Sequence, residues 1–460
     1  MNGKGVGVTA TGDRALEVQA LRGGLSGAIP AIPSKSHAHR ALICAALSEA
    51  PSRVACARSS EDILATVGCL RALGARISAD DAGFSVTPIR REQASGAQTQ
   101  DTGAQAQAPQ APAQPPTPVD LPCGESGTTL RLLLPVVGAL GRSARFHRAG
   151  RLPQRPLSPL YEELSAQGCV LGDPGTEPLT LAGRLEPGAF QLDGSVSSQF
   201  ISGLLFALPL LAGPGKLRLT GKLESRPYVD MTLAALRSSG IEIAFDGETF
   251  CCAAPQVYRA PAEVVIEGDW SNAAFWLCAG ALGARPLTIT GLDPASSQGD
   301  RAVLDILRRF GAAVDCAGDA VTVQGRTLSG IEIDVSDTPD LVPALAVVAT
   351  AASGLTTITG AARLRLKESD RLAAVADVLG RLGAQVEEVE DGLTIQGGRR
   401  LHGAVVDAWG DHRIAMMAAI AAPLCDGSVA ITGAEAVNKS YPQFFEDLRA
   451  LGGLVSEEKG

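Results

Sequence analysis

The chain of 460 residues has few aromatic side chains and no excess of basic ones. It contains eleven Phe, four Tyr and three Trp, and its 49 Asp and Glu outnumber 40 Lys and Arg. Nucleic-acid-binding proteins need a positive field or aromatic stacking platforms, and anionic membranes attract basic surfaces. The net charge of −9 therefore argues against a nucleic-acid or membrane partner.

Metal and secretion signals are also missing. The ten cysteines include no C-x-x-C pair, and scattered cysteines in a long chain are typical of buried small side chains in a reducing compartment. The first residues lack the apolar core of a signal peptide, and apolar runs such as 341–352 are shorter than a bilayer-spanning helix. We expect a cytoplasmic protein without a metal site.

One segment has almost nothing to bury. Residues 92–118 are rich in Ala, Gln, Pro, Thr and Gly and contain no Leu, Ile, Val or aromatic residue. Such a composition cannot offset the entropy lost on ordering. It predicts a mobile surface insertion, with an ordered loop as the alternative.

The rest of the chain repeats a pattern six times, in which a helix-like run ends in Leu-x-x-x-Gly and an apolar stretch follows. Glycine there suits a left-handed helix C-cap that leads into a strand. The glycines are Gly74, Gly168, Gly240, Gly311, Gly383 and Gly452. Their separations are 94, 72, 71, 72 and 69 residues, and without the 27 residues of 92–118 the first becomes 67. This spacing predicts six α/β units of about 70 residues, three in each of two domains. The alternative is that these helix–Gly–strand patterns are not repeats and arise as they could in any α/β protein.

Polar or cationic residues stand before most of the apolar helical runs. IPSKSHAHRALICAALS predicts a turn over 33–37 and a helix over 40–48, with the turn gathering Lys35, Ser36 and Arg40. Helix N-termini favour anions, and arginine suits phosphate and carboxylate. The cations at such positions are Lys35, Arg40, Arg131, Arg155, Lys367, Arg371, Arg413 and Lys439. If these N-termini converge, they form a positive cleft for small, multiply charged anions.

Other residues in these motifs suit proton transfer and hydroxyl recognition. Asp340 and Glu368 lie among the cations and could move protons, and Ser197 to Gln199 could hold hydroxyls and a phosphate. Asp370 is placed to cap a helix that begins with Arg371; a salt-bridged surface turn is the alternative. The sequence has no Walker loop, no G-x-G-x-x-G at a suitable junction, no H-E-x-x-H and no G-x-S-x-G, so we expect no cofactor.

Eight motifs occur in the order found in the enolpyruvyl transferase family, which the chain resembles from about residue 21 to residue 451 outside the insertion. They are P-S-K-S-x-x-x-R, G-x-S-G-T-T-x-R, R-P-L, D-G-S-V-S-S-Q-F, P-D-L, K-E-S-D-R, D-H-R and N-K-S-Y-P. The resemblance is to members that act on shikimate 3-phosphate. It implies a monomer that transfers the carboxyvinyl group of phosphoenolpyruvate to the 5-hydroxyl of shikimate 3-phosphate by addition and elimination, releasing phosphate. It also implies inhibition by glyphosate, which needs the room that Gly127 leaves.

The implied fold is α/β (α+β): two domains of three βαβαββ units each, with the active site in the interdomain cleft. Domain I would comprise residues 1–32 and 267–460 on the phosphoenolpyruvate side. Domain II would comprise 33–266 on the shikimate 3-phosphate side and carry the insertion 92–118.

The resemblance also assigns residues to roles. The catalytic candidates are Asp340 as base for the hydroxyl, Glu368 and Lys35 for proton exchange at the vinyl carbon, and His412 as a partner that tunes Glu368. Shikimate 3-phosphate would contact Lys35, Ser36, Arg40, Ser197, Ser198, Gln199, Ser225, Tyr228, Asp340 and Lys367. Phosphoenolpyruvate would contact Lys35, Gly127, Arg155, Gln199, Arg371, Arg413 and Lys439.

Three residues depart from the family pattern: Glu125 and His39, each where Asn is usual, and Arg363, where some members use Asn. Glu125 adds a negative charge beside the expected phosphoenolpyruvate pocket. A sister transferase acting on a UDP-linked amino sugar is one rival, but it usually has Lys-Asn at Lys35-Ser36 and a cysteine in the loop at 150–156, which has none here. A non-catalytic repeat protein or ring-forming clamp is the other, although the charged residues here differ from unit to unit.

Overall fold

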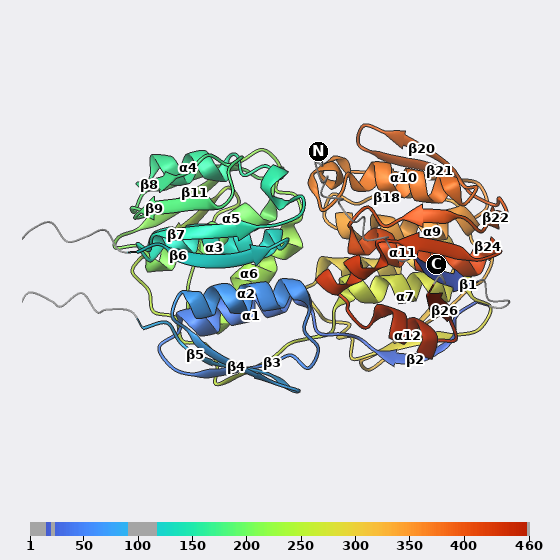
Figure 1. Ribbon diagram of the computed structural model, residues 1–460, viewed down its shortest axis with the longest axis horizontal. Coiled ribbons are helices and arrows are strands. Elements are labelled where there is room, and N and C mark those ends of the chain that lie inside the picture. The colour runs from blue at the N-terminus through green and yellow to red at the C-terminus, as the bar shows by residue number, and fades with distance from the viewer. Residues whose placement is uncertain (1–14, 20–23, 91–116, 458–460) are drawn as a thin grey trace, which may run out of the picture. The chain divides into compact units, whose positions relative to one another are not determined.

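The computed structural model describes residues 15–19, 24–90 and 117–457. The expected insertion at 92–118 therefore lies outside the described residues except for its last two. The chain divides into two compact units, each with its own hydrophobic core. Unit 1 comprises Met1–Ser34 and Glu267–Gly460, and unit 2 comprises Lys35–Ile266. Figure 1 shows the N-terminal strands β1 (Leu16–Gln19) and β2 (Gly27–Pro30), in blue, among the yellow-to-red elements of unit 1.

Six four-stranded sheets share one topology, in which the first two strands are parallel and the others pair antiparallel. In unit 2 the orders are β14 (Glu263–Val265), β3 (Ser52–Ala55), β5 (Gly83–Thr87), β4 (Arg76–Asp80); β6 (Val119–Gly124), β7 (Ala144–Arg148), β9 (Leu179–Gly183), β8 (Cys169–Leu171); and β10 (Ala189–Asp193), β11 (Gly215–Thr220), β13 (Thr249–Cys252), β12 (Ala244–Phe245). In unit 1 they are β2, β15 (Leu287–Thr290), β17 (Ala320–Gln324), β16 (Ala313–Ala317); β18 (Glu332–Asp334), β19 (Leu355–Thr359), β21 (Gly392–Gln396), β20 (Gln385–Val389); and β23 (Val405–Asp407), β25 (Val429–Thr432), β1, β26 (Leu454–Glu457). A short pair, β22 (Leu401–His402) and β24 (Cys425–Asp426), adjoins the last. The predicted six-fold repeat with mixed pairing is confirmed.

Each repeat contributes two helices of different character. The first helix has polar residues in or just before its first turns and an apolar body, and it is buried over most of its length, as expected for a helix enclosed by sheets and other helices. These are α1 (Lys35–Leu47), α3 (Gly127–Ala139), α5 (Ser198–Ala207), α7 (Trp270–Leu282), α9 (Val342–Ala351) and α11 (His412–Ala421). The second helix exposes one face: α2 (Glu61–Ala72), α4 (Leu160–Ala166), α6 (Arg226–Ser238), α8 (Val303–Phe310), α10 (Arg371–Arg381) and α12 (Phe444–Ala450). The buried helices bring their polar N-termini together within each unit.

The six repeat glycines end their helices as predicted. Their φ angles lie between 76° and 108°, a left-handed region that costs glycine little because it lacks a β-carbon. The chain thus turns from each second helix directly into the next strand. Hairpins β4–β5 and β20–β21, each with two intervening residues, follow from the Asp-Ala-Gly and Asp-Gly turns.

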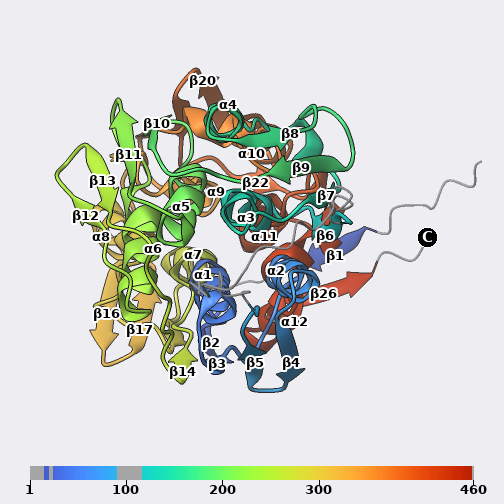
Figure 2. The same cartoon turned by 90° about the vertical axis from the view of Figure 1, so that its left-hand side faces the viewer.

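Two strands pair outside their place in the sequence. β2 precedes α1 along the chain but pairs with β15 after α7, whereas β14 precedes α7 but pairs with β3 after α1. Figure 2, in which unit 2 faces the viewer, shows β14 beside β3. The Ser34 amide donates to the Glu267 carbonyl at 2.8 Å where the chain leaves and rejoins unit 1.

One local prediction was wrong. Residues 33–37 do not form a turn before a helix at 40, because α1 already begins at Lys35. Lys35 and Arg40 therefore project about 140° apart at 3.6 residues per turn. Arg40 is linked by its Nη1 to the Ser36 carbonyl at 2.7 Å, the ordinary i to i−4 spacing. Lys35 and Arg40 consequently turn toward different neighbours of α1.

No helix among residues 15–19, 24–90 and 117–457 is long and apolar enough to cross a membrane.

Candidate active site

Asp340 is the centre of a polar cluster in unit 1. It lies in the short 3-10 turn Pro339–Leu341 at the start of α9. Its carboxylate accepts from Arg371 Nη1 at 2.8 Å and Arg413 Nη2 at 3.2 Å, and Lys367 Nζ lies 3.5 Å away. These contacts show that the starts of α9, α10 and α11 converge within this unit.

Charge pairing sets the protonation of Asp340. Burial raises the pKa of this carboxyl, but Arg413, Lys367 and Arg371 outweigh it and hold the pKa well below its ordinary value. Burial also lowers the pKa of Lys367, against the opposing effect of Asp340. Asp340 is therefore ionised at neutral pH.

Arg371 is the most buried cation of the cluster. Its side chain is 1% exposed, with Nε 2.9 Å from Asp411 Oδ2 and Nη2 2.6 Å from Glu368 Oε2. Asp370 caps α10 by accepting from the Ala373 amide, as predicted. Because Arg371 points into the protein, the alternative of a surface turn is wrong.

Asp411 organises the start of α11. It caps that helix by accepting from the Arg413 amide, and it also accepts from the Ser369 hydroxyl at 3.0 Å. His412 Nδ1 lies 3.8 Å from Asp411 Oδ1, so Asp411 is a carboxylate neighbour of this imidazole. The pairing of His412 with Glu368 stays a prediction. The sequence motif D-H-R contains Asp411, but no role had been assigned to it.

Lys439 reaches the same end of α11 from a different element. The motif suggested that Lys439 stands directly before a helix. Instead it is the last residue of the 3-10 turn Ala434–Lys439. Its Nζ donates to the Gly410 carbonyl at 2.6 Å. Lys439 is thus held one residue from the Asp411 cap.

Two further residues of unit 1 join the cluster without having been predicted. Ser271, in the first turn of α7, accepts from Arg413 Nη2 at 2.8 Å. Asp300 is buried, and burial together with the charge of Asp340 raises its pKa to about 6, although Arg413 and a hydrogen bond from Ser271 oppose the shift. Nothing in the local sequence distinguishes either residue, because only the packing of α7 against the turn at 299–302 brings them here.

Lys35 opens a second cluster, in unit 2. Its Nζ lies 2.7 Å from Asp62 Oδ2 at the start of α2, and both side chains are more than four-fifths buried. Asp62 was missed because the acidic first turn of a helix is common and carries no specific signal. The pair holds the ammonium group at the N-terminus of α1.

Arg40 faces α6 instead. It donates from Nε to Thr232 Oγ1 at 2.9 Å and from Nη2 to the Tyr228 carbonyl at 2.8 Å. Burial lowers the pKa of Arg40 to about 10, with Tyr228 and Cys44 opposing, so the guanidinium stays charged at neutral pH. Ser225 stands at the N-cap position of α6 with a left-handed φ of 51°. The helix begins at Arg226, so Tyr228 lies in its first turn.

Gly127 and Arg155 lie against each other. A β-carbon at Gly127 would be 2.6 Å from Arg155 Nη1, so a larger residue would force this guanidinium to move from its present position. Arg155 is 7% exposed and follows the 3-10 turn Leu152–Gln154. Arg151, in the same loop, is exposed.

Gln199 links the starts of α3 and α5. Its Oε1 accepts from Arg131 Nη1 at 2.9 Å and its Nε2 donates to Thr128 Oγ1 at 3.0 Å. Ser197 caps α5, and Ser198 is the first residue of that helix, as the motif predicted. The polar groups expected for shikimate 3-phosphate in this unit therefore line the starts of α1, α5 and α6.

The three departures from the family pattern lie in different surroundings. Glu125 is exposed and lies against Gly150. Arg363 Nη2 donates to the Ser336 carbonyl at 2.6 Å. His39 is fully buried between α1 and α2.

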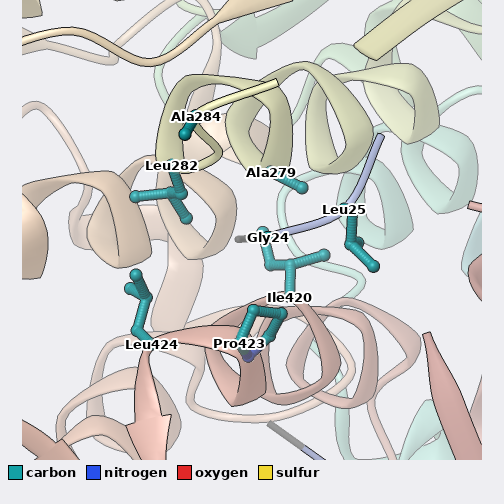
Figure 3. A pocket seen from close by; sticks show the side chains of 8 residues that line it. All are labelled: Gly24, Leu25, Ala279, Leu282, Ala284, Ile420, Pro423 and Leu424. Carbon is teal, nitrogen blue, oxygen red and sulfur yellow. The ribbon is translucent and has the colours of Figure 1, made fainter. Parts of the chain in front are cut away.

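A metal site and an apolar cavity in unit 1 are two alternatives to this site among the described residues. Among the described residues, no group of three or more His, Cys, Asp and Glu could hold a metal ion. A cavity of about 190 Å³ lies at the C-terminal ends of α7 and α11, lined by apolar residues such as Leu25, Leu282 and Ile420 (Figure 3). Helix C-termini and apolar walls disfavour anions, so this cavity does not suit the expected substrates.

Comparison with known proteins points to one family. A family model described as EPSP synthase (3-phosphoshikimate 1-carboxyvinyltransferase) matches residues 21–448. The chain is 42% identical to a 3-phosphoshikimate 1-carboxyvinyltransferase of Clostridium acetobutylicum over 94% of this chain and 96% of the relative. It is 37% identical to one of Methanocorpusculum labreanum over 95% and 99%. EPSP synthase from Acinetobacter baumannii has a similar structure, with a TM-score of 0.76 and 25% identity over 97% of this chain and 100% of the other. The enolpyruvyl transferase NikO from Streptomyces tendae, 22% identical over 97% and 99%, shares the fold with a TM-score of 0.72.

Proposed function

The chain belongs to the EPSP synthase family, and from this membership we propose how its residues divide the reaction. The activity is that of a transferase: it moves the carboxyvinyl group of phosphoenolpyruvate to the 5-hydroxyl of shikimate 3-phosphate and releases phosphate. This step belongs to the shikimate pathway, which leads to chorismate and the aromatic amino acids. The reaction requires cations that compensate the negative charge of two phosphates and two carboxylates. It also requires side chains that move protons at defined atoms.

We propose that unit 1 (residues 1–34 and 267–460), whose first segment extends two residues beyond the expected 1–32, is the phosphoenolpyruvate-side domain. Arg371, Arg413 and Lys439 supply three cations within one cluster, and a phosphate and a carboxylate carry the matching charge. The convergence of Arg371, Arg413 and Lys367 on Asp340 is the observation that best supports this proposal. A bound anion would take over contacts that Asp340 now makes.

Unit 2 (residues 35–266), which begins two residues after the expected start at residue 33, would be the shikimate 3-phosphate-side domain. Ser36, Ser197, Ser198, Gln199 and Ser225 offer neutral hydrogen-bonding groups for ring hydroxyls and phosphate. Arg40 supplies charge near Tyr228. Lys35, Gly127, Arg155 and Gln199 would serve phosphoenolpyruvate, and Lys35, Asp340 and Lys367 would serve shikimate 3-phosphate.

Asp340 is the proposed base for the 5-hydroxyl. A substrate phosphate or carboxylate that attracts Arg413 and Lys367 would weaken their hold on Asp340 and raise its proton affinity. Glu368, 2.6 Å from Arg371, and Lys35 are the proposed groups for proton exchange at the vinyl carbon, with His412 tuning Glu368. In the addition, the hydroxyl gives its proton to Asp340 and its oxygen bonds to the phosphate-bearing carbon of phosphoenolpyruvate, while the CH2 group gains a proton from Glu368 or Lys35 and becomes a methyl group. In the elimination, the tetrahedral intermediate loses phosphate and the methyl group returns one proton to the same side chain, which restores the C=CH2 double bond.

Phosphate release measures this function directly. We expect release when phosphoenolpyruvate and shikimate 3-phosphate are both present, and none with either alone. Replacement of shikimate 3-phosphate by a UDP-linked amino sugar separates the sister reaction. Release only with the amino sugar, or no turnover with any pair, would contradict the proposal.

The cellular setting is part of the same proposal. We propose that the protein acts as a cytoplasmic monomer without a cofactor. All ten cysteines are free thiols and most are buried, which fits a reducing compartment. Sedimentation of the purified protein over a range of concentrations tests the monomeric state.

A further inference from the structure

A chain of buried side-chain hydrogen bonds joins α1, α2 and α3 behind the Lys35 cluster. His39 Nδ1 lies 2.7 Å from Thr66 Oγ1, and Thr66 Oγ1 lies 2.7 Å from Thr129 Oγ1. Thr129 Oγ1 then donates to Ser126 Oγ at 2.8 Å. His39, Thr66 and Thr129 are 0% exposed and Ser126 is 1% exposed. Ser126 and Thr129 belong to the motif G-x-S-G-T-T-x-R and His39 is a departure from the family pattern, whereas Thr66 lies in no motif. The reaction above uses none of these four residues.

The single hydrogen of each hydroxyl fixes the direction of the chain. Thr129 Oγ1 has two acceptors for its one hydrogen, Ser126 Oγ at 2.8 Å and the Asp62 carbonyl at 3.4 Å, so with the hydrogen on either of them Thr129 accepts from Thr66. The Thr66 hydroxyl donates its one hydrogen to Thr129, so it must accept from His39 Nδ1. His39 is therefore the Nδ1–H tautomer, the donor at the head of the chain.

The other ring nitrogen agrees with this assignment. Nε2 of His39 is buried and makes no hydrogen bond to any of the described residues. A buried N–H without a partner is rarer and costlier than a bare lone pair, so Nε2 is better without a hydrogen. Burial, together with the charges of Lys35 and Arg40, lowers the pKa of His39 well below its ordinary value, which keeps the ring neutral.

The last member of the chain sets the start of α3. Ser126 caps this helix, accepting from both the backbone amide and the hydroxyl of Thr129. The next residue is Gly127, whose backbone lies against the Arg155 guanidinium. A shift of Ser126 would therefore move the surface on which Arg155 rests.

We propose that His39 is a positioning residue that, through Thr66 and Thr129, fixes Ser126 and hence Gly127 and Arg155 for phosphoenolpyruvate. This inference rests on the proposed function, because that function identifies the substrate. The direction of the hydrogen bonds is independent of the proposed function. An asparagine at this position, usual in the family, also carries a donor. A leucine fills similar space without one.

Steady-state kinetics of four variants test the positioning. We expect His39→Leu and Thr66→Val to raise the KM for phosphoenolpyruvate by roughly tenfold while the KM for shikimate 3-phosphate changes little, because misplacement by a fraction of an ångström acts on one substrate. His39→Asn should stay close to the wild type. Ser52→Ala, which removes a buried hydroxyl bonded to the Pro261 carbonyl elsewhere in unit 2, is the matched control. It should lower the melting temperature without changing the ratio of the two KM values.

Nitrogen chemical shifts of His39 in the wild-type protein test the direction of the chain without any substrate. We expect a protonated Nδ1 and an unprotonated Nε2 that do not titrate between pH 8 and pH 6. An Nε2–H tautomer, or equal increases of both KM values in the folded His39→Leu variant, would overturn the inference. If the wild type releases no phosphate at all, the proposed function fails while the tautomer measurement still decides the hydrogen-bond direction.

Discussion

The missing side chain of Gly127 leaves the space that the Arg155 guanidinium occupies, since a β-carbon there would lie 2.6 Å from Nη1. Two residues 28 positions apart are thus matched in shape. Arg155 is also nearly buried, so it has little freedom to move aside.

The first prediction follows from this contact. Gly127→Ala should displace Arg155 and raise the KM for phosphoenolpyruvate by roughly tenfold, with kcat less affected, because the change removes binding common to the ground and transition states. Inhibition by glyphosate, expected at millimolar concentrations in the wild type, should weaken in parallel. Gly380→Ala, on the exposed side of α10 where a β-carbon would meet no atom within 4 Å, controls for a general effect of added methyl groups. An unchanged KM in a folded Gly127→Ala variant would show that Arg155 does not bind this substrate.

The second prediction concerns Asp340. Asp340→Ala should lower kcat by about 10²-fold or more, because the hydroxyl loses its base. Because three cations contact this carboxylate, Asp340→Ala also removes their shared partner. Asp340→Asn is the second variant, because it keeps the shape of the side chain and one hydrogen-bond acceptor. Single-turnover phosphate release with both variants, together with equilibrium binding of shikimate 3-phosphate, separates chemistry from binding. Near-normal turnover in either variant would exclude Asp340 as the base.

The third prediction concerns stability. Asp411→Ala should lower the free energy of unfolding by about 3 kcal/mol or more, because it removes a buried partner of Arg371 and the cap of α11. Asp305→Ala provides the control, since it breaks an exposed pair with Arg308 whose carboxylate is 82% exposed and should cost less than about 1 kcal/mol. Urea unfolding followed by circular dichroism measures both. Equal losses in the two variants would mean that the buried pair contributes no more than a surface one.

The fourth prediction uses the raised pKa of Asp300. An unfolded aspartate releases its proton near 3.8, whereas the folded carboxyl holds it to about 6. The folded state therefore binds more protons between these values, and this residue lowers the free energy of unfolding as the pH rises from about 4 to about 6. Asp300→Asn should remove that loss, so the variant gains stability relative to the wild type as the pH increases across this range. A difference between the two proteins that is independent of pH would refute the raised pKa.

The repeat architecture could be predicted from the sequence because its signals are local. A glycine after Leu-x-x-x marks a left-handed cap wherever it occurs, and six evenly spaced examples indicate six units. Asp370 as the cap of α10 was equally visible, since an N-cap acts on amides only two or three residues away.

The electrostatic partners could not be predicted in the same way. Asp62 and Lys35 are 27 residues apart, and only the packing of α1 against α2 pairs them. The same holds for Ser271 with Arg413, which are 142 residues apart. The false turn at 33–37 had a different cause: the polar residues Lys35, Ser36 and His37 suggested a loop, but the first turn of a helix also accepts such residues.

The exchange of β2 and β14 between sheets makes Lys35–Ile266 separable from the rest of the chain. Every strand that closes the three sheets of this segment comes from within it, and the two ends of the remaining chain are joined by the hydrogen bond from Ser34 to Glu267. A gene in which codon 34 is fused to codon 267 would encode a continuous polypeptide with its own three sheets intact. The excised piece would start at the first residue of α1 and finish one residue after β14, so each half could be produced alone and the two tested for reconstitution in trans.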